Sequence, residues 1–375
     1  MTSPLSKGQA MTKLRVALLF GGRSSEHSIS CATAGGVLSA IDREKYEVIP
    51  VGISHDGANV LESDDPARFA LDPGQLPEVV DNGSRVLWPE RAGNRELNVR
   101  HADGRVESLG EIDIVFPILH GPYGEDGTVQ GMLELVGLPY VGSGVLASAL
   151  GMHKHYSKVV LQAAGIAVAP WHTVIAASWK SDPDTAAAAA EQLGYPVFVK
   201  PARAGSSVGV TKVHEPTRLA EAVELALAED EVVLIEAFMP GRELEIAVLG
   251  SRPGERARAS VAGEIVLNGR EFYDFAGKYL DAPGIDLVCP ADLSAAQLAE
   301  IQEAAIRAFE AIGAEGLARV DFFWGDDLVV NEINTMPGFT PISMFPSCWQ
   351  ATGVSYPELI DELLSVALDR GVHLG

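Results

Sequence analysis

Residues 317–334 read LARVDFFWGDDLVVNEIN, and this stretch says most about how the chain folds. Apolar and polar residues alternate on either side of a Gly-Asp-Asp turn, which predicts two antiparallel strands. If the turn centres on its two aspartates, Asp321 lies opposite Glu332 and Arg319 lies opposite Asn334. Because side chains alternate between the faces of a strand, these four share one face, with opposed Cβ atoms about 5 Å apart. The other face is expected to pack in the core through Ala318, Val320, Phe322 and Ile333.

The polar face of this hairpin predicts a metal site. Two opposed carboxylates, Asp321 and Glu332, repel each other unless a cation lies between them, and the amide of Asn334 adds another oxygen. Ligands that are all oxygen favour Mg²⁺ or Mn²⁺, usually alongside substrate phosphates. The alternative is a solvated strand face in which Arg319 supplies the counter-charge.

Away from the hairpin the pattern is mixed α/β. A strand at 15–20, a Gly-Gly turn, a helix and a strand at 46–53 predict a βαβ opening, whereas residues 54–110 give no consistent period. We expect a doubly wound parallel-sheet N-terminal domain followed by two α+β domains. The expected parts are a disordered leader (1–13), an N-terminal domain (14–150), a central domain (151–240) and a C-terminal domain (241–375) with a long loop at about 267–290.

Composition narrows the classes of partner. The 375 residues include 28 Lys and Arg against 51 Asp and Glu, a formal net charge of −23. Nucleic acids and anionic membranes attract clustered positive charge, so neither is an expected partner. The most apolar stretch, 132–152, is broken by Glu134 and Pro139, and only three cysteines are scattered along the chain. A soluble cytoplasmic protein is therefore expected, and any nucleotide site must be locally basic.

Several further segments carry polar residues typical of a nucleotide site. The segment KPARAGSSVG (200–209) joins Lys200 to a glycine- and serine-rich turn whose backbone N–H groups suit phosphate, although an ordinary hairpin turn is the alternative. Lys154 and Lys278 are further candidate phosphate cations, and Glu236 and Glu243 flank a Pro-Gly break. Glu26 begins a helix, where an acid is favoured by the dipole in any case, and His120 follows a buried-type strand at the sheet edge where ligands bind.

Six segments together resemble the D-alanine–D-alanine ligases of the ATP-grasp superfamily. They are GGRSSEHSIS (21–30), LHGPYGEDGTVQG (119–131), KPARAGSSVGV (200–210), FYDFAGKYL (272–280), GLARVDFF (316–323) and NEINTMPGFTPISM (331–344). Each is modest alone, but all six in this order are specific, and the resemblance covers roughly residues 14–370. It implies that ATP phosphorylates the carboxylate of one D-alanine, and that the amine of a second D-alanine attacks the resulting acyl phosphate.

The resemblance also implies a role for each candidate residue. Two Mg²⁺ ions, which Mn²⁺ can replace, are expected at Asp321, Glu332 and Asn334. ATP is expected at Lys154, Lys200, Ser206, Ser207, Glu236, Ala237, Phe238, Met239, Glu243 and Lys278. Arg319 and the Gly338 N–H are expected to stabilise the oxyanion, with Glu26, Ser206 and Tyr279 forming a hydrogen-bonded trio beneath a lid. The D-alanine substrates are expected at Glu26, His120, Tyr279, Arg319, Gly338, Ser343 and Met344, in a protein that is usually a homodimer.

Three positions depart from the family pattern: His153, Ala237 and Phe275 stand where the family often has Asp, Lys and Tyr. None removes a metal ligand or an oxyanion donor, so an active enzyme is expected. The alternatives are a ligase that joins D-alanine to D-lactate or D-serine, for which Tyr279 argues against D-lactate, another ATP-grasp ligase, and an ATP-binding regulator without catalysis.

Overall fold

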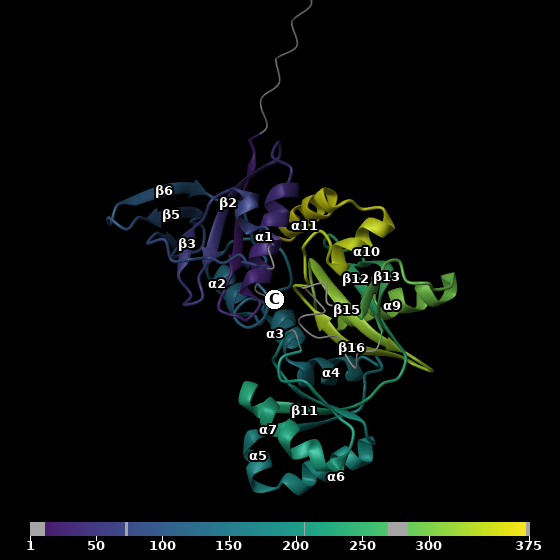
Figure 1. Ribbon diagram of the computed structural model, residues 1–375. Helices are drawn as coiled ribbons and strands as arrows, with labels where there is room; N and C mark the ends of the chain where they lie inside the picture. The colour runs from purple at the N-terminus through teal and green to yellow at the C-terminus, as the bar shows by residue number, and fades with distance from the viewer. Residues whose placement is uncertain (1–11, 72–73, 206, 269–283, 373–375) are drawn as a thin grey trace, which may run out of the picture.

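The computed structural model describes residues 12–71, 74–205, 207–268 and 284–372, which form three lobes (Figure 1). The first lobe is built on a four-stranded sheet of order β3-β2-β1-β7. Its members are β1 (Leu14–Gly21), β2 (Tyr46–Ile53), β3 (Asn59–Leu61) and β7 (Ile114–Pro117). β1 runs parallel to both β2 and β7, and α1 (His27–Ala40) is the crossover helix, so the predicted βαβ opening is confirmed.

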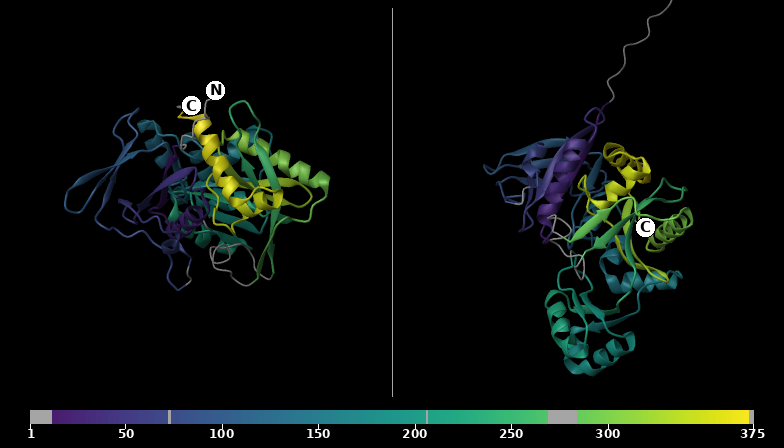
Figure 2. Two further views of the ribbon diagram at one scale, coloured as in Figure 1. Left: turned by 90° about the horizontal axis from the view of Figure 1, so that it is seen from above. Right: turned by 45° about the vertical axis from the view of Figure 1, so that its right-hand side comes forward.

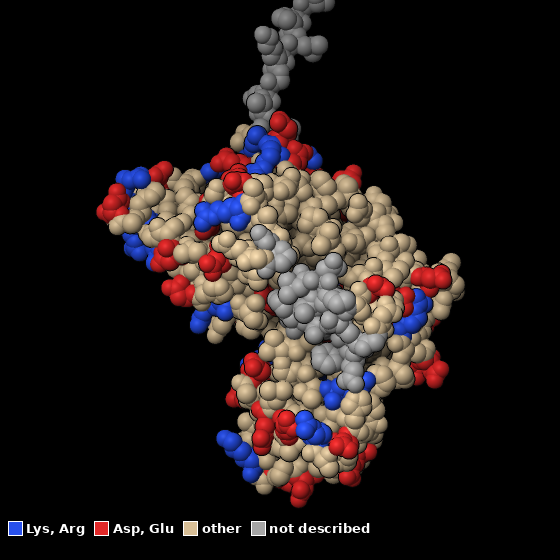
Figure 3. Space-filling model, in the orientation of Figure 1, with Lys and Arg blue, Asp and Glu red and all other residues tan. Residues whose placement is uncertain are grey.

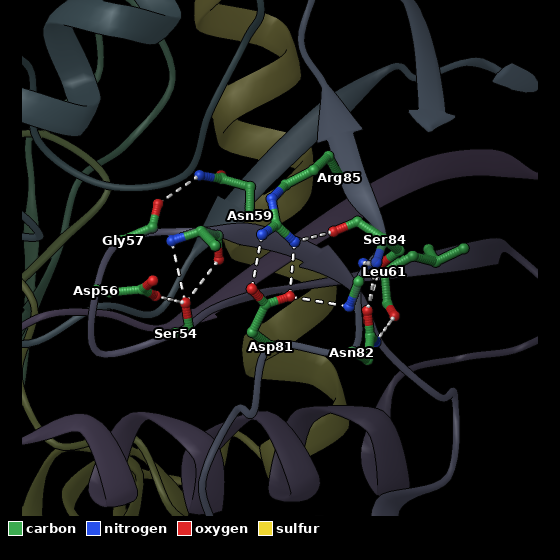
Figure 4. Close-up of polar contacts among 11 residues, drawn as sticks. Ser54, Asp56, Gly57, Asn59, Leu61, Asp81, Asn82, Ser84 and Arg85 are labelled. Carbon is green, nitrogen blue, oxygen red and sulfur yellow. Dashed lines mark hydrogen bonds and ion pairs between the residues drawn. The ribbon is translucent and has the colours of Figure 1, made fainter. Parts of the chain in front are cut away.

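Residues 54–110, for which the sequence gives no period, form short elements held by local contacts. η1 (Pro66–Phe69) is a single 3₁₀ turn, and β4 (Arg85–Leu87), β5 (Glu96–Arg100) and β6 (Val106–Glu111) make a small antiparallel sheet. Figure 4 shows the approach to β4, where the Arg85 guanidinium donates to both oxygens of Asp81 at 2.6 Å and Ser84 donates to Asn82. Such turns depend on hydrogen bonds of polar side chains rather than on hydrophobic period, so the apolar pattern of the sequence does not reveal them.

The helices that follow β7 lead out of the first lobe. They are α2 (Thr128–Val136), α3 (Val145–Met152) and α4 (Lys154–Ala163). The backbone of His153 is extended, with φ −100° and ψ 94°, and separates α3 from α4. Between α2 and α3, Tyr140 forms an isolated parallel bridge with Val115 of β7.

The second lobe stands apart at the bottom of Figure 1. Its sheet has the order β10-β9-β11-β8 and is antiparallel throughout. The strands are β8 (Trp171–Ile175), β9 (Val197–Pro201), β10 (Thr211–Val213) and β11 (Val232–Ala237). They pack with α5 (Ala176–Ser181), α6 (Pro183–Leu193), η2 (Pro216–Arg218) and α7 (Leu219–Glu229) around a core of their own. The strands on either side of the glycine- and serine-rich segment, β9 and β10, pair antiparallel.

The third lobe is a five-stranded antiparallel sheet of order β14-β13-β12-β15-β16. Its strands are β12 (Arg242–Leu249), β13 (Arg258–Leu267), β14 (Ile285–Val288), β15 (Leu317–Trp324) and β16 (Leu328–Asn334). β14 lies inside the segment expected to be a loop. Its residues form a strand because they pair with the end of β13. The helices of this lobe are α9 (Ala295–Ala311), α10 (Met344–Thr352) and α11 (Tyr356–Arg370).

The two faces of this third sheet pack against different parts of the chain. One face packs against α9 and against residues of α3 and α4, in a cluster that includes Ala147, Leu161 and Phe309. The other shares a cluster with the first lobe through α10 and α11, and the two views of Figure 2 show α11 between the first and third sheets. The first and third lobes are therefore joined by continuous core, whereas the second has its own.

The β15–β16 hairpin has the predicted pairs, Arg319 with Asn334 and Asp321 with Glu332. The turn centres on Asp326 rather than between Asp326 and Asp327, because Trp324 pairs with Leu328, and a bulge at Asn331 restores the predicted register. The predicted core face is also confirmed, since Ala318, Val320, Phe322 and Ile333 all lie in the cluster below the sheet.

Positive and negative side chains are mixed on the surface. On the face drawn in Figure 3, Lys and Arg are interspersed with Asp and Glu and form no continuous basic patch. Among the residues that the structure describes, no helix is both long and apolar enough to cross a membrane.

Candidate active site

One cavity of about 1350 Å³ lies where the three lobes meet, and every described candidate residue lines it. From the first lobe and the helices after it come Glu26, His120 and Lys154; from the second, Lys200, Ser207, Glu236, Ala237, Phe238 and Met239; from the third, Glu243, Arg319, Asp321, Glu332, Asn334, Gly338, Ser343 and Met344. Three candidates, Ser206, Lys278 and Tyr279, lie outside the described residues.

Three acidic side chains form a row across neighbouring strands of the third sheet. Glu245 on β12 is in register with Asp321 on β15, and Asp321 is in register with Glu332 on β16. Arg319 binds this row: its Nε lies 2.7 Å from Asp321 Oδ1, and its Nη2 lies 2.7 Å from Asp321 Oδ2 and 3.3 Å from Glu245 Oε1. Burial opposes the charge of Arg319, but Asp321 and Glu245 raise its pKa further above the usual value. The guanidinium is therefore held as a fixed positive charge.

The far end of the row meets a lysine of another element. Lys154 Nζ lies 3.5 Å from Glu332 Oε2 and donates to the carbonyl oxygen of Ala204 at 2.9 Å. Asn334 donates its Nδ2 to Asp321 Oδ2 at 3.1 Å. Lys154 thus connects the acidic row to the turn that follows β9.

The donor set on this face fits a hard divalent cation that shares its shell with a substrate. Asp321, Glu332 and Asn334 offer carboxylate and amide oxygens along one cavity wall. Within the described ranges no three His, Cys, Asp or Glu side chains are grouped closely enough to hold a metal by themselves. A site with so few protein ligands suits Mg²⁺, because this ion is commonly bound by one or two carboxylates together with substrate phosphates and waters.

On the cavity wall that the second lobe contributes, a buried carboxylate lies between two lysines. Glu236 is only 2% exposed, with Lys200 Nζ 2.6 Å from Oε1 and Lys158 Nζ 2.7 Å from Oε2. Burial alone raises a carboxyl pKa, but Lys200 and Lys158 together bring that of Glu236 below its usual value. Burial also lowers the pKa of Lys158. Glu236 therefore sets the position of Lys200, a candidate phosphate ligand.

The carboxylate of Glu26 lies between two glycines of different segments. Glu26 is the N-cap residue of α1, but its side chain makes no capping hydrogen bond to the helix. A Cβ on Gly205 would lie 2.7 Å from Glu26 Oε2, and one on Gly121 would lie 3.2 Å from the same atom. The glycine turn of the second lobe therefore comes directly against Glu26 of the first.

His120 is buried beside Glu26 and has one ring nitrogen without a protein partner. Its Nδ1 lies 3.0 Å from the Met336 carbonyl oxygen, so Nδ1 carries the proton and donates. Its Nε2 is buried and has no hydrogen-bond partner among the described residues. Burial lowers the pKa of His120, which favours the neutral ring. Nε2 is thus a hydrogen-bond acceptor in the wall of the cavity, and a donor group on a bound ligand can satisfy it.

At the remaining wall, the loop after β16 leads into α10. Ser343 is the N-cap of α10, and its Oγ lies 2.7 Å from Thr340 Oγ1. A Cβ on Gly338 would lie 3.2 Å from this same Oγ. The Gly338 backbone therefore approaches the Ser343 hydroxyl closely, and a side chain there would crowd it.

Three cavity or near-cavity residues are missing from the sequence prediction: Lys158, Glu245 and Glu125. Lys158 lies one helical turn after Lys154, and Glu245 lies two residues after Glu243 on the same strand, so spacing places each on the same face as a candidate residue but does not indicate its partner. Glu125 belongs to the quoted 119–131 segment; it accepts from the Gly121 N–H at 2.7 Å. Burial first and Glu26 second raise its pKa to about 8.

Three lobes around one cavity, with lysines on one wall and an acidic row on another, define a ligase of the ATP-grasp class. The family descriptions that match are D-ala D-ala ligase N-terminus, over residues 15–143, and D-ala D-ala ligase C-terminus, over residues 160–365. The chain belongs to the D-alanine–D-alanine ligase family.

Curated relatives and solved structures agree with this assignment. The D-alanine–D-alanine ligases of Arthrobacter sp. (strain FB24) and Kineococcus radiotolerans are each 52% identical to this chain, over 96% of it and over 96% and 98% of their own lengths. The D-alanine–D-alanine ligase structure from Coxiella burnetii is similar with a TM-score of 0.79 at 35% identity, covering 96% of this chain and 94% of that one. The VanG D-Ala:D-Ser ligase from Enterococcus faecalis has a TM-score of 0.81 at 33% identity, covering 95% and 100%.

Proposed function

We propose that this chain joins two D-alanine molecules into D-alanyl-D-alanine at the expense of ATP, as a step in peptidoglycan precursor synthesis. The observation that carries the proposal is the cavity between the three lobes, which brings the acidic row, Lys154, Lys200 and the Glu26–His120 pair together. Full-length identity of 52% to curated D-alanine–D-alanine ligases supports it.

The first step needs phosphate groups held against a carboxylate. We assign Lys154 and Lys200 to the α- and β-phosphates of ATP, with backbone N–H groups of the Ser207 turn beside them. Both lysines are fixed by carboxylates, Glu332 and Glu236, and can exchange part of that pairing for phosphate oxygens. The carboxylate of the first D-alanine then attacks the γ-phosphate, the bond to ADP breaks, and an acyl phosphate results. This activates a carboxylate that otherwise resists nucleophiles.

Asp321, Glu332 and Asn334 are the residues that we propose to hold Mg²⁺, two ions by analogy with the family, with Mn²⁺ as a substitute. When bound, the ions would neutralise part of the negative charge on the β- and γ-phosphates. Asp321 and Glu332 also orient Arg319 and Lys154, so the same carboxylates organise both kinds of cation.

The second step needs stabilisation of a tetrahedral oxyanion. The amine of the second D-alanine attacks the acyl phosphate, and collapse of the intermediate releases phosphate and the dipeptide. We assign the oxyanion to Arg319 and the Gly338 N–H. Arg319 uses Nε and Nη2 for Asp321 and Glu245, and we assign Nη1 to the substrate. Fixed donors lower the barrier because they need no reorganisation during the reaction.

The amino-acid subsites follow from the first lobe and from α10. Glu26 would receive the ammonium of the first D-alanine, with His120 Nε2 as a neighbouring acceptor. Ser343 and Met344, at the start of α10, would receive the carboxylate of the second. Helix N-termini favour anions through their unpaired N–H groups and the helix dipole, which supports this orientation.

We place the nucleobase against the segment that links the second and third lobes. Its backbone runs through Ala237, Phe238 and Met239, and Lys212 Nζ lies 4.5 Å from the centre of the Phe238 ring. Glu243 is assigned to the ribose hydroxyls. The Glu236 carboxylate is paired with two lysines, so we assign adenine recognition to the backbone and leave Glu236 to position Lys200.

The rest of the family comparison also stays a proposal. Lys278 would reach the γ-phosphate, and Glu26, Ser206 and Tyr279 would form the trio beneath the lid, although only Glu26 is among the described residues. We further propose a cytoplasmic homodimer of three domains. Because Leu161 of α4 packs in the core of the third lobe, we place the start of the central domain near β8 rather than at residue 151.

The test is ATP- and Mg²⁺-dependent phosphate release with the product mass read alongside. Release with D-alanine alone, and a D-alanyl-D-alanine mass, is the expected result. Because a D-Ala:D-Ser ligase is among the similar structures, D-serine and D-lactate are each tested with D-alanine. Release only with one of these would reassign the second substrate, and ATP binding without release would identify a regulator.

A further inference from the structure

Two of the three cysteines face each other between the third sheet and α10. Cys289 directly follows β14 and Cys348 lies within α10, and their Sγ atoms are 3.6 Å apart although the residues are 59 positions apart in sequence. Cys348 is fully buried, whereas Cys289 is partly exposed. An oxidant can therefore reach one sulfur while the other lies behind it.

The two sulfurs differ in reactivity. The contact with Cys348 lowers the pKa of the Cys289 thiol, which increases the fraction of the reactive thiolate. The same contact, together with burial, raises the pKa of Cys348. Cys31 is a natural control: it is buried in the first lobe, and burial followed by Glu62 raises its pKa to about 12. Cys289 is the expected site of attack on an oxidant, and Cys348 the expected resolving thiol.

We propose that Cys289 and Cys348 form a reversible disulfide when the protein meets hydrogen peroxide, and that this bond lowers ligase turnover. The Cys289 thiolate attacks one peroxide oxygen and the O–O bond breaks. The leaving hydroxide takes up the proton that the thiol had released, so a sulfenic acid and one water result. The Cys348 thiol then attacks that sulfur, an S–S bond forms and a second water leaves. Two thiols are oxidised and one peroxide is reduced to two waters, and a dithiol reverses the reaction by exchange.

The effect on turnover follows from what the disulfide would connect. Ile285, Asp286 and Leu287 of β14 line the cavity, and so do Ser343 and Met344 at the start of α10. Met344 also lies against β13, where a Cβ on Gly263 would overlap its side chain. A covalent bond between β14 and α10 restrains both parts of this wall. This part of the inference rests on the proposed function, whereas formation of the disulfide does not.

The first experiment counts thiols and needs no activity. The full-length protein is treated with hydrogen peroxide, denatured, alkylated and weighed. We expect three adducts on the reduced protein and one on the oxidised protein, with a peptide mass joining Cys289 to Cys348 and return to three adducts after dithiothreitol. Cys348→Ser should remove the cross-link, and Cys31→Ala should retain it. An unchanged thiol count, or a cross-link that includes Cys31, would overturn the proposal.

The second experiment measures phosphate release by the oxidised protein. We expect a severalfold loss of turnover that dithiothreitol restores, in the wild type and in Cys31→Ala but not in Cys348→Ser. A quantitative cross-link without loss of turnover would overturn the link to the cavity. If the reduced protein releases no phosphate with any substrate, the proposed function fails, and the thiol count still decides whether the disulfide forms.

Discussion

Arg319 and Asp321 bind each other through two parallel contacts, Nε to Oδ1 and Nη2 to Oδ2, each 2.7 Å long. Such forked pairs are among the stronger hydrogen-bonded contacts in proteins and fix direction as well as distance. The pair joins two roles that we propose separately, the oxyanion donor for Arg319 and a metal ligand for Asp321. A change that moves either side chain therefore affects both. Glu245, 3.3 Å from Arg319 Nη2, fixes the guanidinium from the other side.

We expect Glu245→Gln to lower kcat about tenfold, the size that loss of about 1.4 kcal/mol of transition-state stabilisation produces. The substitution keeps the shape of the side chain but removes a charge that holds Arg319. KM for ATP should change less, because Glu245 is not assigned to the nucleotide. Steady-state kinetics check this, with Glu303→Gln as control, since Glu303 pairs with Arg256 on the surface of α9. Equal kinetics in the two variants would contradict the role of Glu245.

Glu332→Ala should abolish turnover while the fold is retained. Glu332 is half-buried at the end of the acidic row and contacts Lys154, so its loss removes a proposed metal ligand and releases a phosphate cation. Phosphate release at several Mg²⁺ concentrations and a thermal melt are the measurements. Asp326→Ala, in the turn of the same hairpin, is the control, and removal of divalent ions with a chelator should mimic the active-site variant. Turnover unchanged in Glu332→Ala would refute the metal assignment.

The hairpin that carries Glu332 shows how far sequence reasoning reaches. Alternation within one hairpin predicts the pairs Arg319–Asn334 and Asp321–Glu332, and both form. The agreement depends on two compensating features that alternation does not show, a turn centred on Asp326 alone and a bulge at Asn331. The family resemblance adds the order of the segments, and the fold class is as expected.

Other parts of the site could not be predicted because they depend on which strands are neighbours. Glu245 becomes a partner of Arg319 only when β12 lies beside β15, and its own segment does not indicate that order. Lys158 contributes to the site only because the position of α4 brings its Nζ within 2.7 Å of Glu236 Oε2. β14 is four residues long and is found through its pairing with β13, since so short a strand carries too little pattern.

Lys158→Met should destabilise the protein and weaken ATP binding. Loss of one partner from a buried ion pair typically costs about 3–5 kcal/mol, because the remaining charge stays buried. Lys200 still compensates Glu236, so the lower end of that range is expected, and Lys200 then has less freedom to meet a phosphate. Denaturant unfolding and KM for ATP are the measurements, with the exposed Lys180→Met as control. The double variant Lys158→Met, Glu236→Gln should lose further stability, because Lys200 is then left without its counter-charge, and a recovery instead would speak against this account.

Gly205→Ala should raise KM for D-alanine. The new Cβ would lie 2.7 Å from Glu26 Oε2, and the end of a side chain yields more readily than backbone, so the carboxylate is displaced. Because Glu26 is assigned to the ammonium of the first substrate, affinity for that substrate should fall while the fold persists. Gly131→Ala is a matched control, since nothing lies within 4 Å of a Cβ at that position. Kinetics at varied D-alanine that match the control would contradict the position of Glu26.

Glu125 gives the protein a pH dependence of stability with a definite sign. Its pKa is about 8 in the folded chain because of burial and the nearby Glu26, against an ordinary 4.5. Between those values the folded state holds a proton that the unfolded state has released, so stability falls as pH rises through this window. Above the folded pKa the carboxylate is ionised in both states and the loss of stability is complete.

Glu125→Gln keeps an acceptor for the Gly121 N–H but has no charge to bury. Thermal melts from pH 5 to pH 8 should therefore show the difference in Tm, variant minus wild type, becoming more positive as pH rises. A difference that stays constant, or shrinks towards pH 8, would mean that Glu125 is already ionised in the folded protein at neutral pH.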